Sequence, residues 1–232
     1  MFRGLISGLT QNLPVFLCRL PALLLALTVH ETAHGYVANK LGDPTAKDMG
    51  RLTLNPLKHL DPIGALMMLF FGFGWARPVP INPRNFRHPK TGMALSALAG
   101  PVSNILLAFL GVLVYEVLYL TPIVYSDSGV VYALFMFLTI FIYLNVSLAI
   151  FNLIPVPPLD GSRILLTFLP PKAYFGLMKY ERYIVLVLII LLYIDIPTPA
   201  GSFNLISTPI SFLSTKLVNG MFSLLELLPF FR

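Results

Sequence analysis

The chain has 232 residues, of which 56% are hydrophobic and 11% are charged, and its formal net charge is +6. Soluble domains carry about 25% charged residues, so this composition excludes an ordinary soluble protein. The cations cluster between apolar runs, which indicates a role in membrane topology and not in nucleic-acid binding. We therefore predict an all-α polytopic membrane protein that forms a single domain over residues 1–232.

Apolar runs of helical length predict about five transmembrane helices. In chain order they cover approximately residues 14–40, 92–120, 130–151, 180–196 and 203–230. Between the first two, the apolar part of Asp61–Ala76 has only about 14 residues, too few to span, so we predict a re-entrant segment there. The sequences "GRLTL" from Gly50 and "PVPIN" from Pro78 predict a small β-hairpin.

The distribution of lysine and arginine predicts the orientation. If Asp61–Ala76 is re-entrant, 13 of the 16 cations share one side of the membrane. These are Lys40, Lys47, Arg51, Lys58, Arg77, Arg84, Arg87, Lys90, Arg163, Lys172, Lys179, Arg182 and Arg232. We therefore expect a multi-pass protein of the plasma membrane, with the N-terminus outside, the C-terminus in the cytoplasm and the basic loops cytoplasmic.

The sequence "TVHETAH" places two histidines and a glutamate inside the first predicted span. His30 and His34 are four residues apart, so on a helix they share a face and can bind one metal ion, while Glu31 can serve as an acid or base beside it. Ionisable groups within a span are costly and typically functional. The alternative is a pair of histidines satisfied by hydrogen bonds inside the helix bundle.

A catalytic zinc site needs a third protein ligand, and Asp160 is the strongest candidate. It follows the proline-rich break in "NLIPVPPLDG", where the third span cannot continue as a helix. His30 precedes Lys40 by 10 residues and Asp160 precedes Lys172 by 12, so both lie about 15 Å below the same membrane surface. A simple helix N-cap is the alternative role for Asp160. His59 and His88 are interpreted as solvated loop histidines.

Three segments together resemble the site-2 protease family of intramembrane zinc metalloproteases. They are "HETAH", "AGPVSN" with Gly100, Pro101 and Asn104, and "NLIPVPPLDG" from Asn152 to Gly161. The stretch "GRLTLNPLKHLDPIG" is similar to the compact bacterial branch, which lacks PDZ and CBS domains. The resemblance covers about residues 20–170, so a catalytic core of about 14–170 and additional C-terminal helices over 171–232 are expected.

The resemblance implies one zinc ion per chain, held by His30, His34 and Asp160, with Glu31 as the acid and base. It also implies cleavage of peptide bonds in or near transmembrane segments of membrane-protein substrates, either in regulated intramembrane proteolysis or in clearance of membrane peptides. The implied partners are these substrates, the lipid bilayer and an unidentified regulatory membrane protein, with no nucleic acid.

Two amides at membrane depth, Asn104 and Asn152, have two alternative roles. Either could contact the substrate backbone or the developing oxyanion, or could satisfy non-helical backbone near Asp160. For the whole protein, the alternative function is metal binding or transport without proteolysis. Glu31 distinguishes these functions, because a site that only holds metal has no need of an additional carboxylate.

Overall fold

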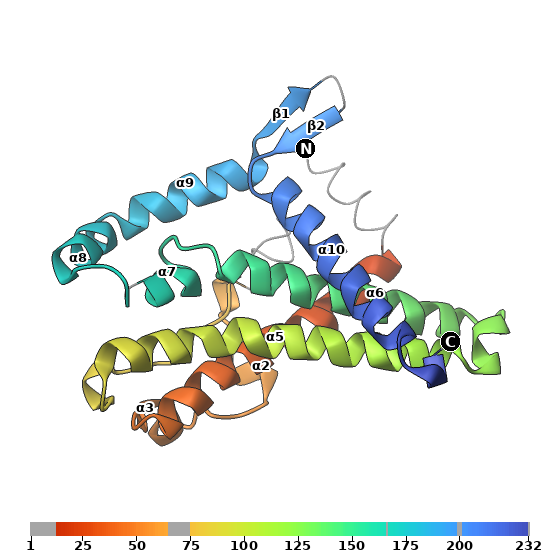
Figure 1. Cartoon of the computed structure of the whole chain (residues 1–232), viewed down its shortest axis with the longest axis horizontal. Helices are drawn as coiled ribbons and strands as arrows, with labels where there is room; N and C mark the ends of the chain where they lie inside the picture. Colours follow the sequence, from red (N-terminus) through yellow and green to blue (C-terminus); the bar gives the residue numbers. More distant parts are fainter. Residues whose placement is uncertain (1–12, 65–74, 166, 199–200, 232) are drawn as a thin grey trace.

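The computed structural model describes residues 13–64, 75–165, 167–198 and 201–231. Its centre is formed by α2 (Leu13–Lys40), α5 (Pro89–Tyr119) and α6 (Gly129–Asn152). All three helices are long and apolar enough to cross a membrane. Even α6 is about 36 Å long, against a hydrocarbon thickness of about 30 Å. The three helices pack against one another, with α5 and α6 side by side in Figure 1.

Small residues allow the central helices to approach closely. A Cβ atom at Gly111 of α5 would lie 2.9 Å from Cγ1 of Ile142 on α6. A further helix, α10 (Ser207–Glu226), packs over α5 and α6 and completes a buried apolar cluster. The cluster consists of Ala108, Val112, Ile142, Val146, Val218 and Leu225.

The remaining elements are short. They are α3 (Thr45–Asp48), the 3-10 helices η1 (Pro56–Lys58), η2 (Pro83–Asn85), η3 (Pro122–Tyr125) and η4 (Pro229–Phe231), then α7 (Asp160–Leu165), α8 (Pro171–Lys179), α9 (Glu181–Tyr193), and the strands β1 (Asp195–Thr198) and β2 (Gly201–Asn204).

The first three predicted spans are confirmed as candidate membrane helices, whereas the last two differ from the prediction. The 13 residues of α9 extend about 20 Å, too short to cross. The 20 residues of α10 have the length of a span but not its apolar composition. Most of the predicted re-entrant segment, residues 65–74, lies outside the described residues.

A two-stranded antiparallel sheet is present, but not where the sequence predicted it. β1 pairs with β2, with Asp195 opposite Asn204. The predicted pairing of residues 50–54 with 78–82 is wrong, because neither segment is a strand and the neighbouring chain forms one isolated bridge, Leu60 to Ala76. Pro78 and Pro80 have no N–H for a strand ladder.

Asn204 connects α9 to α10. Its amide nitrogen donates to the carbonyls of Leu192 and Ile194 at the end of α9, at 3.1 and 3.0 Å. Its amide oxygen accepts from the N–H groups of Ile206 and Ser207 at the start of α10, at 3.0 and 2.8 Å. One side chain thus satisfies backbone groups that both helix ends leave unpaired.

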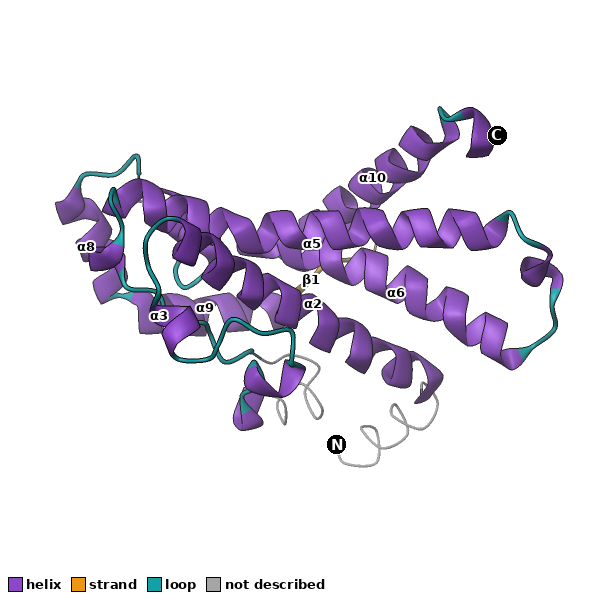
Figure 2. Cartoon of the chain, turned by 90° about the horizontal axis from the view of Figure 1, so that it is seen from below, coloured by secondary structure: helices purple, strands orange, loops and turns teal. Residues whose placement is uncertain are grey.

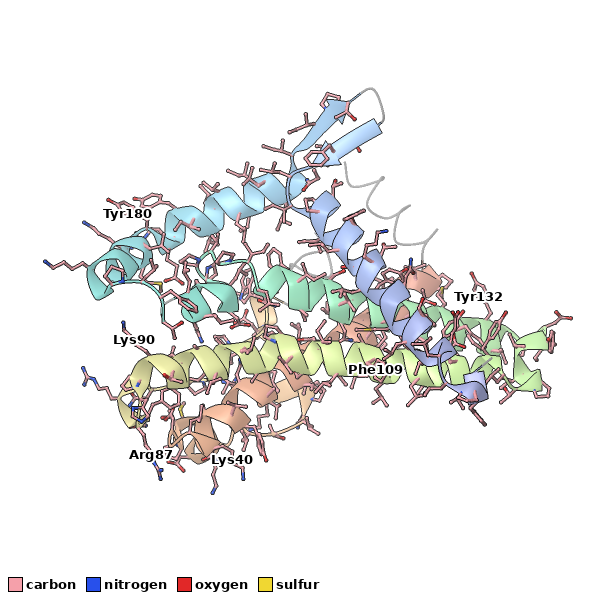
Figure 3. The ribbon with its side chains drawn as sticks, in the orientation of Figure 1. Lys40, Arg87, Lys90, Phe109, Tyr132 and Tyr180 are labelled. Atoms are coloured by element: carbon pink, nitrogen blue, oxygen red, sulfur yellow. The ribbon has the colours of Figure 1, made fainter. Side chains whose placement is uncertain are left out.

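The bundle has two distinct ends (Figures 2 and 3). Lys40, Arg87 and Lys90 lie at one, which we call the basic end, and the α5–α6 connection lies at the other, which we call the loop end. The first turns of α2 lie near the loop end, where Cys18 Sγ contacts the carbonyl of Ala133 at 3.7 Å.

The last turns of α10 also lie at the loop end, where Phe222 stacks edge-on against Tyr115 with ring centroids 5.6 Å apart. In the described helices, the start of α2 and the end of α10 therefore lie at the same end of the bundle, whereas the sequence predicts the two chain termini on opposite faces; the orientation of the termini stays a prediction. The physical reason is the shortness of α9: α9 and α10 together make one passage from the basic end to the loop end, where the sequence predicted two.

Asp43 ties the loop after α2 to the chain before α5. Its carboxylate accepts from the N–H of Asn82 and the side-chain amide of Asn85, both at 2.7 Å, and from Thr45. Burial acts to raise the pKa of Asp43, but the hydrogen bonds from Thr45, Asn85 and Asn82 outweigh it and hold the pKa below its ordinary value.

We expect Asp43→Ala to lower the free energy of unfolding by about 2 kcal/mol, because it removes the hydrogen bonds that this buried carboxylate accepts from Thr45, Asn82 and Asn85. Thermal unfolding in dodecyl maltoside, followed by circular dichroism, measures the effect, and the exposed Asp48→Ala is the control. Because the folded pKa is depressed, the stabilisation is fully present above about pH 5 and is lost as pH falls through the unfolded and then the folded pKa. Equal melting temperatures for Asp43→Ala and Asp48→Ala at pH 7 would contradict this role.

Candidate metal centre

Three buried side chains converge between α2 and the first residue of α7. His30 Nε2 and His34 Nε2 are 3.0 Å apart, and Asp160 Oδ2 lies 3.1 Å from the first and 3.3 Å from the second. His30, His34 and Asp160 are exposed by 8% or less. Nitrogen and oxygen ligands about 2.05 Å from a tetrahedral zinc ion are about 3.3 Å from one another. The triangle therefore has the size of one face of a zinc coordination shell.

Hydrogen bonds to the far side of each imidazole determine where its proton lies. His34 Nδ1 is 2.7 Å from the carbonyl of Ser96, which can only accept, so Nδ1 carries the proton. His30 Nδ1 is 2.6 Å from Oδ1 of Asn104 and is likewise the donor. In the neutral imidazoles both Nε2 atoms therefore present lone pairs toward Asp160.

This arrangement suits a bound cation. Two nitrogen lone pairs and a carboxylate oxygen face one another within 3.3 Å. Asp160 Oδ2 is buried without a hydrogen-bond donor among the described residues. Neutral histidine and carboxylate are ligands that suit zinc, and outer hydrogen bonds to histidine Nδ1 typically accompany metal ligation. The residues present thus fit a zinc ion on their chemistry as well as on their spacing.

The orientation of Asn104 is fixed in turn by Asn145 of α6. Asn145 Nδ2 donates to the carbonyl of Phe141 at 2.9 Å, which leaves its Oδ1 to accept from Asn104 Nδ2 at 2.8 Å. Asn104 Nδ2 also lies 3.4 Å from the carbonyl of Ala26. Both asparagines are fully buried. A chain of oriented amides therefore runs from a backbone carbonyl of α6 to His30.

Asn104 does not line the metal pocket, in contrast to the substrate contact considered from the sequence. Its side chain has no exposed surface and both of its polar atoms are engaged. The geometry favours a role in positioning His30. Asn145 was missed by sequence reasoning, although an amide within a 24-residue apolar helix is a recognisable signal.

The absence of a side chain at Gly100 leaves space for the imidazole rings of His30 and His34. A Cβ atom there would lie 2.5 Å from His34 Nε2 and 2.6 Å from His30 Cε1. One turn earlier, Ser96 is fully buried and accepts from His34 through its carbonyl, while its hydroxyl donates to the carbonyl of His34. The "AGPVSN" segment therefore forms the wall on which both imidazoles rest.

The break after α6 brings Asp160 to the histidines. The helix ends at Asn152, and the Pro157–Pro158 peptide bond in the following turn is cis. A Cβ atom at Gly161 would collide with the carbonyl oxygens of Leu153 and Ile154. Glycine is thus required for the chain to fold back closely enough to begin α7 beside α2.

Glu31 lies at the mouth of the site, against the segment from Arg77 to Ile81. Its Oε2 accepts from the N–H of Val79 at 2.9 Å. Arg51, which the sequence interpretation counted only as a topological cation, holds the same segment by donating to the carbonyls of Arg77 and Pro78 at 2.7 and 3.3 Å. Glu31 and Arg51 therefore both hold this segment through its backbone.

The burial of His59 contradicts its interpretation from the sequence as a solvated loop histidine. It is 2% exposed, and its Nε2 donates to the carbonyl of Thr53 at 2.8 Å. Its own carbonyl accepts from the N–H of Arg77 at 2.8 Å. Thr32, next to Glu31, donates to the same Thr53 carbonyl. His59 therefore joins α2, the loop after α3 and the segment beside Glu31.

The ligand triangle and Glu31 line a cavity of about 130 Å³. Asn152 and Arg163 line it too, together with residues of the Pro78–Ile81 segment and Pro158. Asn152 donates through Nδ2 to the carbonyl of Leu148 at 3.0 Å, which leaves its Oδ1 for another partner. Of the two amides singled out in the sequence, only Asn152 lines this cavity.

Comparisons with known proteins agree with this geometry. Residues 120–194, which include the "NLIPVPPLDG" segment, match peptidase family M50. The chain is 44% identical over 188 residues to "Putative zinc metalloprotease YwhC" of Bacillus subtilis, covering 79% of this chain and 81% of that protein. The chain belongs to peptidase family M50, the site-2 proteases.

More distant M50 relatives carry similar names. "Putative zinc metalloprotease Rip2" of Mycolicibacterium smegmatis is 28% identical, over 77% of this chain and 67% of its own length. "Putative zinc metalloprotease MJ0611" of Methanocaldococcus jannaschii is 28% identical over 65% and 70%. No solved structure matches the chain significantly.

Family membership decides several expectations. The protein is a multi-pass membrane zinc metallopeptidase of the site-2 protease type. Its cofactor is zinc, which the His30, His34 and Asp160 triangle can hold. Between the two functions considered from the sequence, membership in a peptidase family favours the enzyme over the metal carrier.

We expect Gly100→Ala to reduce zinc affinity by about 100-fold or more, because the added methyl group displaces both imidazoles. Chelator competition on purified protein measures the affinity independently of activity. Gly129→Ala is the matched control, since a Cβ atom there meets nothing within 4 Å. A Gly100→Ala protein that binds zinc as tightly as Gly129→Ala would disprove the role of α5 as the wall of the site.

Proposed function

We propose that this protein hydrolyses peptide bonds in or near the transmembrane segments of membrane proteins. His30, His34 and Asp160 hold one zinc ion, and Glu31 is the acid and base. The observation that supports this best is the convergence of three ligand atoms beside Glu31 in a buried cavity. Residues of about 14–170 form the catalytic core, since all the groups that line this cavity belong to them.

The depth of the site supports a substrate within the membrane. His30 precedes Lys40, at the basic end of α2, by 10 residues, or about 15 Å of helix. That is about half of the hydrocarbon thickness. A cleavage site at this depth favours bonds buried in the bilayer over bonds in its loops.

The residues divide the chemical work between them. A bound zinc ion would polarise the scissile carbonyl and acidify the attacking water. Glu31 takes the proton of that water and returns it to the leaving amine. Its Oε2 is engaged by the Val79 N–H, so we assign the proton transfer to Oε1. Arg163 in the cavity wall is placed to offset the negative charge that develops on the carbonyl oxygen.

The size of the cavity supports an unwound substrate. A helix with its side chains is about 10 Å wide, and 130 Å³ cannot contain one. An extended chain fits better beside the Pro78–Ile81 segment, which is neither helix nor strand, with Asn152 hydrogen-bonded to the substrate backbone. The proposal applies equally to a signalling substrate and to a membrane peptide that is being cleared.

We expect Glu31→Gln to retain zinc and to cleave a single-span substrate 10² to 10⁴ times more slowly, because it removes the acid and base but no ligand. Asp160→Ala should lose both zinc and cleavage. Zinc content and cleavage in dodecyl maltoside are measured together, with Glu116→Gln as the control for loss of a carboxylate. Cleavage by Glu31→Gln at the rate of Glu116→Gln would refute the assigned mechanism.

We further propose that the basic end faces the cytoplasm, as the excess of cations there indicates. In a Cys18→Ser background, cysteines at Lys47 and Arg87 should react with an impermeant reagent only after permeabilisation. Cysteines at Asp127 and Leu228, at the loop end, should react in intact cells. Labelling of Lys47 and Asp127 from the same side would overturn this orientation.

A further inference from the structure

A second and larger cavity lies along the membrane-spanning part of the molecule. It has a volume of about 650 Å³ and is lined by residues of α2, α6 and α10, with Leu192 of α9. We call it the α2–α6 groove. Among the described residues that line it, Arg19 carries the only charge.

The groove leads toward the metal centre along both helices. On α6, Ile140, Leu144 and Leu148 line it at intervals of four residues, and the next position in that series is Asn152 of the metal cavity. On α2, Arg19 precedes His30 by 11 residues, which is three helical turns and about 16 Å. Arg19 therefore lies on nearly the same face of α2 as His30, toward the loop end.

The groove wall is mostly apolar, and three of its hydroxyl groups are hydrogen-bonded within the protein. Thr139 donates to the carbonyl of Phe135, Ser147 bonds to Ser214, and Ser211 donates to the carbonyl of Ser207. Because these hydroxyl groups are already engaged within the protein, the wall is suited to apolar side chains. This chemistry fits a transmembrane helix better than a polar peptide.

Arg19 is the exception to this apolar lining. It forms no ion pair or hydrogen bond within the described part of the chain. It precedes Lys40 by 21 residues, about 32 Å along the helix, so the two cations flank one hydrocarbon thickness. An unpaired guanidinium at the rim of an apolar groove is complementary to a carboxylate at the boundary of a membrane span.

We propose that the α2–α6 groove receives the part of the substrate's transmembrane helix that lies between the scissile bond and the loop-end membrane surface, and that Arg19 pairs with a substrate carboxylate at that surface. This inference rests on the proposed function. It adds a specificity: substrates carry an aspartate or glutamate about 11 helical residues, or 16 Å, from the cut.

Binding of charge-swapped peptides tests the groove without depending on cleavage. Two fluorescent single-span peptides are compared, identical except for Asp or Lys placed 11 residues from the cut on the loop-end side. Their dissociation constants are measured by anisotropy with Glu31→Gln protein, which cannot consume them. We expect the Asp peptide to bind about tenfold more tightly.

Adding Arg19→Glu to the Glu31→Gln protein should reverse this preference, whereas Lys216→Glu should leave it unchanged. Lys216 lies on α10 outside the groove lining, so it controls for the change in net charge. Reversal by Arg19→Glu alone identifies the pair, because a merely structural defect would weaken both peptides equally. Equal weakening, or no preference in the starting protein, overturns the proposal.

Measuring peptide binding both in detergent and in lipid vesicles distinguishes a substrate carboxylate from a lipid phosphate as the partner of Arg19. Dodecyl maltoside carries no phosphate, and there the Asp preference should persist. A preference that is present in dodecyl maltoside but lost in phosphatidylcholine vesicles would assign Arg19 to the lipid phosphate in a bilayer and refute the proposal. Failure of the proposed function is distinguishable, because it would show as peptides that bind with the expected preference to Glu31→Gln but are not cleaved by the wild-type protein.

Discussion

The mutual repulsion of three ligand atoms is the constraint on which the structure depends. His30, His34 and Asp160 direct two lone pairs and a carboxylate oxygen at one point, an arrangement that a bound cation stabilises. Much of the surrounding structure maintains this convergence. The Ser96 carbonyl and Asn104 fix the imidazole protons, Gly100 makes room, and Gly161 allows Asp160 to approach.

The parts of the site that could be predicted from sequence are those encoded locally. His30 and His34 share a helical face by spacing alone, and the prolines before Asp160 require a chain break. The depth of both segments followed from the rise of a helix and the nearest cations. The structure brings these three residues together as that argument required.

The parts that could not be predicted depend on contacts between distant segments. In the sequence, Arg51 counts only as a topological cation and His59 as a solvated loop histidine. In the structure, Arg51 donates to the carbonyls of Arg77 and Pro78, and His59 donates to the carbonyl of Thr53. The spacing of residue types in a sequence does not show which backbone carbonyls remain free to accept hydrogen bonds from side chains. The predicted hairpin failed because Pro78 and Pro80 cannot donate to a strand ladder, and the side chain of Arg51 bonds to the carbonyls of Arg77 and Pro78 instead. The sequence predicted α9 as a full membrane span. The structure ends this helix at Tyr193, where the side chain of Asn204 satisfies the carbonyls of Leu192 and Ile194.

The amide of Asn145 has a consequence for the assembly of the bundle. Helix α6 is apolar on every side, so hydrophobic burial scarcely distinguishes one rotation about its axis from another. A turn by one residue, about 100°, would leave Asn145 facing lipid and Asn104 without its acceptor. A single buried hydrogen bond between amides thus selects the angular setting of α6, and with it the direction in which the chain emerges toward Asp160.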